Sequence, residues 1–573
     1  LRIKFLRQLI SMKNKPTSKM KQASSTKHPK FIFVVGGVIS GVGKGIAASS
    51  IGTLLKARGH KVTAIKIDPY VNVDAGTMNP TEHGEVFVLA DGDECDQDMG
   101  NYERFLDTTL SKTNYMTTGR VYQTVIQKER NLEYKGKCVQ VVPHIPLEVI
   151  ARIKKAQKEA NADVVIIEIG GTVGEYENIL FLEAARMLKI ENHDDVAFVM
   201  VSYLPVPSKV GEMKTKPTQH AVRNLNATGI QPDVILARSN TFLDDKRKEK
   251  LALFCNVRRE RIISAPDVDS VYDIPTNFER DNLGNILCGV LQLKDKHKST
   301  LTEWTTFFNK AKKYTKEVNI AVVGKYFDTG DFVLSDSYIS IIESLKYAAY
   351  ALKAKPVLHW LNSKDFEIKN TKKLAQLKKY DGILVPGGFG SQGVEGKINV
   401  IRYARENKIP FFGICYGMQL AVIEYARNVL AMKDAHTTEV NPTTTFPVID
   451  ILPEQKEKLL RKEYGNSMRL GTYKARLKEK TLAYKAYQSM VIDERHRHRY
   501  EVNPEYVAKL QQKDLQFSGT SPDGTLMEIC ELPLSTHPFF LAVQFHPEFK
   551  SRPFAPHPLF NAFVSTSLKN KKA

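Results

Sequence analysis

The sequence contains few cysteines, no cysteine pair of the C-x-x-C type and no long hydrophobic run. The six cysteines are scattered over the 573 residues, at Cys95, Cys138, Cys255, Cys288, Cys415 and Cys530. This spacing argues against a structural zinc site and against a disulfide framework, and it fits a reducing compartment such as the cytoplasm. Since no apolar run approaches the ~20 residues that span a bilayer, we expect no transmembrane helix and no membrane partner.

Acidic residues are absent from the first 30 positions, which carry nine Lys or Arg. Nearly half of the net charge of +20 therefore lies in this segment. We interpret residues 1–30 as a disordered basic tail, and an organellar targeting peptide is the alternative. The rest of the chain is only mildly basic, which suits small anions such as nucleotides better than nucleic acid, so we expect no nucleic-acid partner.

Short apolar runs of the buried-strand type alternate with helical segments through the first half of the chain. With 42% hydrophobic and 25% charged residues, the composition is that of an ordinary soluble protein. The alternation predicts an α/β fold with a mostly parallel sheet covered by helices on both faces, and ligands at the carboxyl ends of the strands. The expected strands are 31–35, Val62–Ile67, Cys138–Val142, Val164–Ile169, Val196–Val201 and Val234–Ala237.

A lysine-rich segment at about 294–317 interrupts this rhythm, and a new strand pattern begins at Val318. We expect a first α/β domain over 31–298 and a linker over 299–316, with a helical segment around Trp304. A second α/β domain would cover 317–565, followed by a frayed tail over 566–573.

The segment 31–45, F-I-F-V-V-G-G-V-I-S-G-V-G-K-G, is the most informative in the chain. It predicts a strand, a glycine-rich turn and a helix, which together direct backbone N–H groups and a helix dipole at one point where a triphosphate fits. We interpret it as a nucleotide phosphate loop in which Lys44 adds a positive charge. Gly45 stands where Ser or Thr usually holds magnesium, so the ion would need carboxylates from elsewhere.

Two acidic positions are candidates for that role. Asp98 closes an acidic stretch, and Glu168 ends an expected strand beside two glycines. An acidic run by itself is more often a solvated loop, but the missing loop hydroxyl favours a magnesium site. The nearby run K-T-K-P-T-Q, Lys214 to Gln219, would clamp a second triphosphate, although exposed lysines are usually solvated.

A second chemical site is indicated around Cys415. The sequence G-I-C-Y-G follows an expected strand and opens a helix, which is the pattern of a nucleophile elbow with a thiol in place of a hydroxyl. The helix N-terminus favours the thiolate, whereas most single cysteines are inert packing residues. Gly388 and the backbone after Cys415 would donate to the oxyanion.

The base and its orienting partner are expected in Q-F-H-P-E-F. His546 and Glu548 are two residues apart at the end of a predicted strand, Phe539–Phe545, and on an extended segment such residues face the same side. Alone, this motif would more often be a surface turn. The run Arg495 to Tyr500, R-H-R-H-R-Y, suits a clamp for a carboxylate better than a nucleic-acid patch.

Taken together, these motifs resemble the cytidine triphosphate synthase family from Phe31 to Phe563. The most specific pieces are G-G-V-I-S-G-V-G-K-G, K-I-D-P-Y, E-H-G-E-V-F-V, E-I-G-G-T-V-G, K-T-K-P-T-Q, P-G-G-F-G, G-I-C-Y-G-M-Q, E-R-H-R-H-R-Y-E-V-N and F-H-P-E-F. The resemblance implies an N-terminal amidoligase domain of phosphate-loop type and a C-terminal class I glutamine amidotransferase domain. It implies ATP-dependent amination of UTP to CTP through a phosphorylated intermediate, with ammonia from glutamine and a water-poor passage between the domains.

The resemblance also implies residue roles. ATP would contact Ser40, Gly41, Val42, Gly43, Lys44, Gly45, Lys66 and Asp98, and Mg²⁺ would be held by Asp98 and Glu168. The pyrimidine nucleotide would contact Ser40, Glu175, Tyr176, Glu177, Lys214, Lys216, Gln219 and Lys250. Glutamine would contact Gly388, Tyr416, Gly417, Met418, Gln419, Glu439 and Arg499, and the triad would be Cys415, His546 and Glu548.

GTP as an allosteric activator, homotetramers and filaments are further implications of the resemblance. Two positions depart from the family pattern: Tyr176 lies in Glu-Tyr-Glu where the family often has Asp-Ile-Glu, and Gln392 stands where many relatives carry Arg. The alternatives are another glutamine-dependent amidoligase and an inactive nucleotide-regulated scaffold. The lysine pair argues against the first, and the complete Cys–His–Glu set argues against the second.

Overall fold

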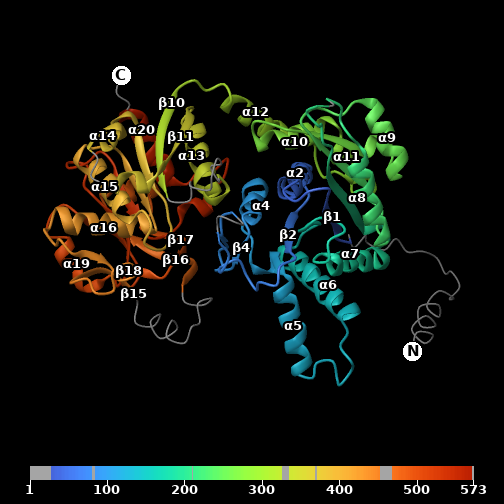
Figure 1. The fold of residues 1–573 in the computed structure, drawn as a ribbon, viewed down its shortest axis with the longest axis horizontal. Coiled ribbons are helices and arrows are strands. Elements are labelled where there is room, and N and C mark those ends of the chain that lie inside the picture. Colours follow the sequence, from blue (N-terminus) through green and yellow to red (C-terminus); the bar gives the residue numbers. More distant parts are fainter. Residues whose placement is uncertain are drawn as a thin grey trace.

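The computed structural model describes residues 28–79, 84–209, 211–324, 335–367, 371–451 and 468–570. Most of the predicted basic tail, residues 1–27, and the end of the C-terminal tail, 571–573, lie outside the described residues. The same holds for Glu82 and His83 of the E-H-G-E-V-F motif. Figure 1 shows two halves side by side, joined by the segment that contains α12 (Leu301–Ala311) and leads into β10 (Glu317–Gly324).

The N-terminal half is built on a seven-stranded sheet with the order β5-β2-β6-β1-β7-β8-β9. Every neighbouring pair is parallel, as expected for strands that are apolar along their whole length and covered on both faces. In chain order the strands are β1 (Lys30–Gly37), β2 (Val62–Asp68), β5 (Tyr115–Thr117), β6 (Val164–Ile169), β7 (Val196–Tyr203), β8 (Val234–Ser239) and β9 (Ile262–Pro266).

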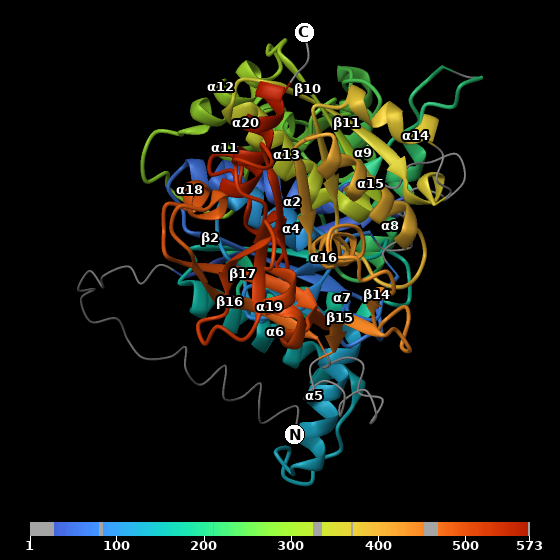
Figure 2. The same cartoon turned by 90° about the vertical axis from the view of Figure 1, so that its left-hand side faces the viewer.

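Helices cover both faces of this sheet, so the predicted architecture of the first half is confirmed. They are α2 (Lys44–Ala57), α4 (Asp98–Leu106), α5 (Thr118–Arg130), α6 (Val141–Ala160), α7 (Ile179–Glu191), α8 (Lys216–Ala227), α9 (Asp245–Cys255), α10 (Ile274–Arg280) and α11 (Leu283–Val290). Helices α5 and α6 pack on each other and extend beyond the sheet (Figures 1 and 2).

One predicted strand is wrong. Residues 138–140 form neither strand nor helix, and Val141 begins α6, with a non-helical residue at Val142. Both valines are exposed, because this segment leads into the projecting helix pair and has no sheet neighbour to cover it. Apolar, β-branched residues were therefore a misleading signal here.

The C-terminal half is built on a nine-stranded mixed sheet with the order β11-β10-β12-β13-β21-β20-β19-β16-β17. Its other strands are β11 (Lys355–Asn362), β12 (Gly382–Val385), β13 (Phe411–Ile414), β16 (Arg469–Leu477), β17 (Val491–His498), β19 (Gln516–Thr520), β20 (Met527–Glu531) and β21 (Phe540–Val543). A small sheet contains β14 (Ala435–Thr437), β15 (Phe446–Ile451) and β18 (Tyr500–Val502), and β3 (Phe87–Val88) pairs with β4 (Glu94–Cys95) in the first half.

Helices flank this sheet as well: α13 (Ile339–Ala351), α14 (Thr371–Ala375), α15 (Val394–Glu406), α16 (Tyr416–Asn428), α18 (Leu482–Tyr487), α19 (Pro504–Leu510) and α20 (Pro558–Asn570). Because α20 continues to Asn570, the prediction of a frayed tail from residue 566 is wrong for residues 566–570. The buried Phe560 and Phe563 pack against Phe412 of β13 and hold this helix on the sheet.

The two halves share packed surface. Phe549 of the C-terminal half belongs to the apolar core of the first half, and its ring lies 4.9 Å from that of Phe87. Trp304 of α12 is buried in the same core and donates to the carbonyl of Tyr272 at 2.9 Å. The expected linker helix is therefore present and is packed on the first half. No described helix is both long and apolar enough to cross a membrane.

Candidate functional site

The segment after β1 forms the predicted phosphate loop. Gly41 and Gly43 have φ values of 68° and 89°, a left-handed conformation that glycine adopts without strain, and α2 begins at Lys44. The ammonium of Lys44 donates to the carbonyl of Gly171 at 2.9 Å, and its side chain is buried. All eight residues predicted to contact ATP line one cavity of about 810 Å³ together with Glu168.

Lys66 lies among carboxylates inside this cavity. Its Nζ atom is 3.0 Å from Oε1 of Glu168, contacts Asp98, and lies 3.7 and 3.8 Å from Asp68 and Asp96. Burial lowers the pKa of Lys66, but these carboxylates outweigh it and hold the pKa well above its ordinary value. Burial raises the pKa of Asp96 and Glu168, and the neighbouring charge of Asp98 raises both pKa values further, against the effect of Lys66.

This donor set fits a divalent cation. Mg²⁺ prefers hard oxygen ligands, and Asp98 and Glu168 offer carboxylates beside the phosphate loop. The geometry also explains Gly45, because a Cβ atom at this position would lie 2.0 Å from Oδ1 of Asp98. The carboxylate of Asp98 thus fills the place where a loop hydroxyl would be.

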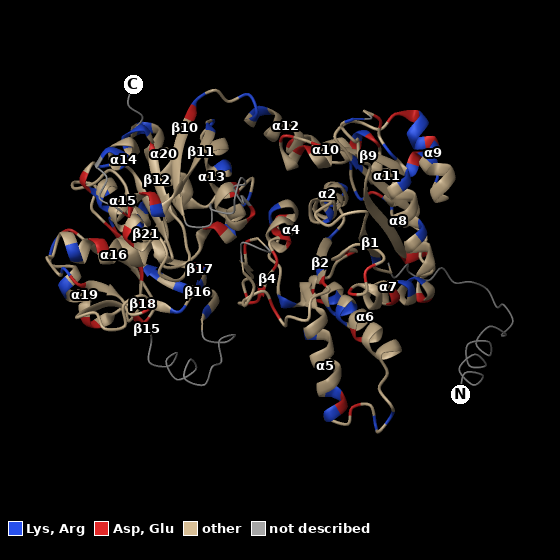
Figure 3. Ribbon diagram, viewed as in Figure 1, with Lys and Arg blue, Asp and Glu red and all other residues tan. Residues whose placement is uncertain are grey.

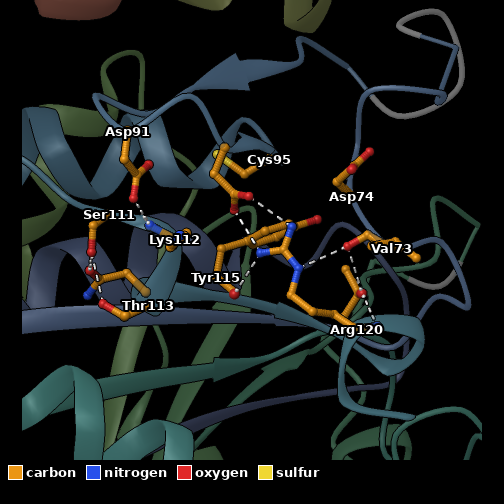
Figure 4. Close-up of polar contacts among 12 residues, drawn as sticks. Val73, Asp74, Asp91, Cys95, Ser111, Lys112, Thr113, Tyr115 and Arg120 are labelled. Atoms are coloured by element: carbon orange, nitrogen blue, oxygen red, sulfur yellow. Dashed lines mark hydrogen bonds and ion pairs between the residues drawn. The ribbon is translucent and has the colours of Figure 1, made fainter. Parts of the chain in front are cut away.

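Polar contacts hold Asp68 and the chain segments beside the carboxylate cluster in place. The hydroxyl of Tyr115 donates to Asp68 at 3.0 Å, and the guanidinium of Arg120 lies over the Tyr115 ring. Arg120 also donates to the carbonyl of Val73 (Figure 4). Two further nitrogens of Arg120 donate to Asp93, at 2.8 and 2.9 Å. The loop after β2 is therefore tied to α5 next to the cluster.

A second, mostly apolar cavity of about 330 Å³ adjoins the phosphate loop and was not found from the sequence. Gly43, Ile46 and Ala47 contribute to it from the loop side, and Phe278 lies on the opposite helix. Its position at the ends of β7, β8 and β9 is where parallel sheets bind ligands, so strand order was the signal that could have located it.

The residues predicted for the pyrimidine nucleotide are only partly brought together. Ser40, Glu175 and Glu177 line the large cavity. Tyr176 is 92% exposed, and Lys214 pairs with Glu212 at 2.7 Å on the surface. The remaining residues, Lys216 and Gln219 of α8 and Lys250 of α9, do not line that cavity.

Cys415 occupies a nucleophile elbow, as predicted. It lies between β13 and α16 with φ 52° and ψ −103°, and its N–H donates to the carbonyl of Val543 at 2.6 Å. A Cβ atom at Gly387 would lie 2.9 Å from Cε1 of His546 and 3.6 Å from Cβ of Cys415. The imidazole and the thiol residue thus flank one backbone position that only glycine can occupy.

His546 and Glu548 are in contact, as predicted, but the backbone between them does not have the predicted extended conformation. Nδ1 of His546 lies 2.7 Å from Oε1 of Glu548, and the residues Pro547–Lys550 form a 3₁₀ turn instead of an extended strand end. Burial lowers the pKa of His546, but the charges of Glu548 and Cys415 raise it to about 10. The imidazole is therefore positioned and charged to act with the thiol.

Five of the seven predicted glutamine-binding residues, Gly388 and Tyr416 to Gln419, lie in the elbow helix or line the cavity beside it. Gly388 lines the cavity of about 70 Å³ that also contains Cys415 and His546. Glu439 accepts from the N–H of Gly390 at 2.8 Å, and the Tyr416 hydroxyl donates to the Gly390 carbonyl at 3.0 Å. Gln419 donates to the carbonyl of Tyr500 at 2.9 Å, Gly417 and Met418 are buried at the start of α16, and Arg499 lies between β17 and β18.

The prediction of a substrate clamp is wrong for Arg495, which is buried against the N-terminal half, and stays a prediction for Arg497, which also lines the cavity that contains Cys415. These two side chains bind carboxylates of the N-terminal half, at 2.9 Å between Arg495 and Glu103 and 2.8 Å between Arg497 and Glu94. Since strand residues alternate between faces, His496 and His498 point the other way and contact each other at 2.9 Å. The motif therefore forms part of the contact between the two halves.

The thiol cavity is lined by both halves of the chain. Glu85 and Val86 come from the N-terminal half, whereas Cys415, His546 and Glu548 come from the C-terminal half. Glu85 accepts from the N–H of Ser340 at 3.2 Å and from its hydroxyl. A small molecule released at the thiol is thus formed directly against the half that carries the phosphate loop.

Comparisons with known proteins agree with this division. The chain matches the families described as CTP synthase N-terminus, over residues 30–293, and Glutamine amidotransferase class-I, over residues 333–566. It is 51% identical to the CTP synthase of Halalkalibacterium halodurans, over 94% of this chain and 99% of that protein. It is 52% identical to the CTP synthase of Pyrococcus furiosus, over 95% and 98%. The solved glutaminase domain of Trypanosoma brucei CTPS with bound acivicin is 36% identical, with a TM-score of 0.41, and covers 45% of this chain and 96% of that chain.

Proposed function

The chain belongs to the CTP synthase family, and we propose which step of CTP synthesis each half of the chain performs and which residues take part. The enzyme is a ligase that uses ATP and the side-chain nitrogen of glutamine to convert UTP to CTP. The observation that carries our account is the thiol cavity shared by both halves, with Glu85 on one wall and Cys415 on the other.

We propose that the C-terminal half, residues 317–565, hydrolyses glutamine. Cys415 attacks the side-chain amide, and His546 gives its proton to the departing nitrogen, which leaves as ammonia, while Glu548 holds the imidazole in position. Water then cleaves the resulting glutamyl thioester, which releases glutamate and restores the thiol. The backbone N–H groups of Gly388 and Tyr416 stabilise the oxyanion. Glutamine is oriented by the remaining predicted contacts, which are Gly417, Met418, Gln419, Glu439 and Arg499.

The proposed role of the N-terminal half, residues 31–298, is to activate the uracil carbonyl with ATP. Lys44, Lys66 and the N–H groups of 40–45 bind the phosphates, and the apolar cavity beside Ala47 and Phe278 accepts the adenine base. Asp98 and Glu168 would hold Mg²⁺, which when bound neutralises phosphate charge.

The positions of Tyr176, Lys216 and Lys250, which are exposed, and of Lys214 and Gln219, which are half-buried, support a proposal about assembly. Because they do not line the large cavity of their own chain, we propose a homotetramer in which a neighbouring copy completes the pyrimidine nucleotide site. Filament assembly and activation by GTP complete this proposal. Sedimentation with and without UTP and ATP tests it, and a monomer under both conditions would contradict it.

We propose the cytoplasm as the location of the protein, since all six cysteines are free thiols. Acidic and basic residues are interspersed over the helices of both halves, as on α9 (Figure 3), which fits small anionic substrates and no nucleic acid.

The activity is tested with the purified full-length protein, UTP, ATP, Mg²⁺ and glutamine isotopically labelled in its amide nitrogen. The proposed function predicts CTP that carries the label at its exocyclic nitrogen, and no CTP when ATP or UTP is omitted. CTP without the label, or label released only as ammonia, would contradict the proposal.

A further inference from the structure

Helix α4 is in contact with both chemical sites. It begins at Asp98, the proposed magnesium ligand, and its Tyr102 hydroxyl donates to Oε2 of Glu168. The next residue, Glu103, belongs to the interface between the halves. The helix has nine residues and therefore spans only about 14 Å, so the two sites that it contacts are close together.

Glu103 forms ion pairs with two arginines of the C-terminal half. Its side chain is fully buried and accepts from Arg495 at 2.9 and 3.1 Å and from Arg552 at 2.6 Å. The N–H of Leu110 donates to it as well, at 2.8 Å. A buried carboxylate with this many donors is fixed in place, and removing its charge leaves two guanidinium groups uncompensated.

Both arginines form hydrogen bonds with the chain segment that contains His546 and Glu548. The backbone carbonyl of Arg495 accepts from the N–H of His546 at 2.7 Å. Arg552 donates to the carbonyls of Phe549 and Ser551, at 3.1 Å each, and these residues lie in and after the 3₁₀ turn that contains Glu548. A displacement of Glu103 would therefore move the backbone on both sides of the His546–Glu548 contact.

We propose that Glu103 is a positioning residue that couples glutamine hydrolysis to occupation of the metal–nucleotide site. The inference rests on the proposed function of the two halves. Binding at Asp98 and Glu168 shifts α4. Glu103 transmits this shift to Arg495 and Arg552. As a result, His546 and Glu548 move to the position in which they can act with Cys415. Ammonia is then formed mainly when the site that consumes it is filled.

The test compares the wild type, Glu103→Gln and a control, Tyr347→Phe, as full-length proteins. Tyr347 is also buried, and its hydroxyl contacts Tyr272 across the same interface, but among the described residues this hydroxyl makes no hydrogen bond to Glu103, Arg495 or Arg552. Two rates are measured: CTP formation from ammonium, and glutamate release from glutamine with and without Mg²⁺, ATP and UTP.

We expect the nucleotides to raise kcat for glutamate release in the wild type and in Tyr347→Phe. In Glu103→Gln that stimulated kcat should fall about tenfold or more, with KM for glutamine nearly unchanged, because a small misplacement of catalytic groups has effects of this size. CTP formation from ammonium should stay within about twofold of the wild type.

Equal losses with glutamine and with ammonium would overturn the coupling role, as would a Glu103→Gln variant that is stimulated like the wild type. If Glu103→Gln does not fold, Arg552→Lys keeps a positive charge beside Glu103 but loses the guanidinium fork that binds the turn. In Arg552→Lys, the stimulation of glutamate release by Mg²⁺, ATP and UTP should be severalfold weaker than in the wild type. If the ratio of the rates with and without these ligands equals that of the wild type, the proposal is overturned. A wild type that makes no CTP from ammonium would contradict the proposed function instead, and the stimulation of glutamate release would still be measurable.

Discussion

Nδ1 of His546 lies 2.7 Å from Oε1 of Glu548, although the backbone between them turns instead of running straight. The carboxylate fixes the imidazole and, together with Cys415, raises the pKa of His546 to about 10 against the opposing effect of burial. The imidazole is therefore protonated at neutral pH, and it can give a proton to the departing ammonia.

Glu548→Gln should lower the pKa of His546 and reduce glutamate release by about 10²- to 10⁴-fold, as when the orienting carboxylate of a triad is replaced by an amide. CTP formation from ammonium should be retained, because the N-terminal half is untouched. Parallel loss of both activities would contradict separate sites.

The same substitution has a predicted pH signature in stability. The pKa of His546 in the folded protein lies above its ordinary value of 6.5. The stabilisation of the folded state by the His546–Glu548 contact is therefore fully present below pH 6.5, and it is lost as the pH rises through about 10. The difference in unfolding free energy between wild type and Glu548→Gln should shrink over this window in denaturant titrations. A difference that grows with pH would contradict the assignment.

Gly45→Ala should disable the metal–nucleotide site, because the added methyl would lie 2.0 Å from Oδ1 of Asp98. We expect CTP formation to fall about 100-fold with either nitrogen source, with weaker binding of Mg²⁺ and ATP in calorimetry. Gly289→Ala is the matched control, since its Cβ would meet open space. Normal ATP binding by Gly45→Ala would contradict the proposed role of Asp98.

Glu85 should make the contact between the halves depend on pH. Burial raises the pKa of Glu85 to about 7, although the hydrogen bonds from Ser340 and the charge of Arg104 favour the ionised form. Because the folded pKa is above the ordinary 4.5, stability from this group is present at low pH and is lost as the pH rises through 7.

Glu85→Gln, which resembles the protonated form, should therefore gain stability relative to the wild type between pH 5 and pH 8, by up to about 3 kcal/mol. The measurement is the unfolding free energy of both proteins across that range. A stability difference that is the same at pH 5 and pH 8 would show that Glu85 does not titrate there.

The sequence predicted those parts of the two sites that are encoded locally. A strand, glycines and a helix within 31–57 are enough to specify the phosphate loop, and the glycines around Cys415 are enough to specify the elbow. The contact between His546 and Glu548 was also predicted, but its 3₁₀ geometry depends on Pro547 and on packing that the alternation rule ignores.

What could not be predicted depends on distant partners. Arg495 resembles a substrate clamp in the sequence because Glu103, its carboxylate partner, lies 392 residues away. The apolar cavity beside Ala47 is assembled from strand ends that only the sheet order brings together. Val141 and Val142 looked like strand residues, yet they have no neighbouring strand and remain exposed.

The most direct test of two cooperating sites is CTP formation by Cys415→Ala with glutamine and with ammonium as alternative nitrogen sources. We expect loss of glutamine-dependent CTP, since no other group replaces the thiol, and a rate with ammonium equal to that of the wild type. Loss of CTP with both sources, or CTP from glutamine without the thiol, would contradict it.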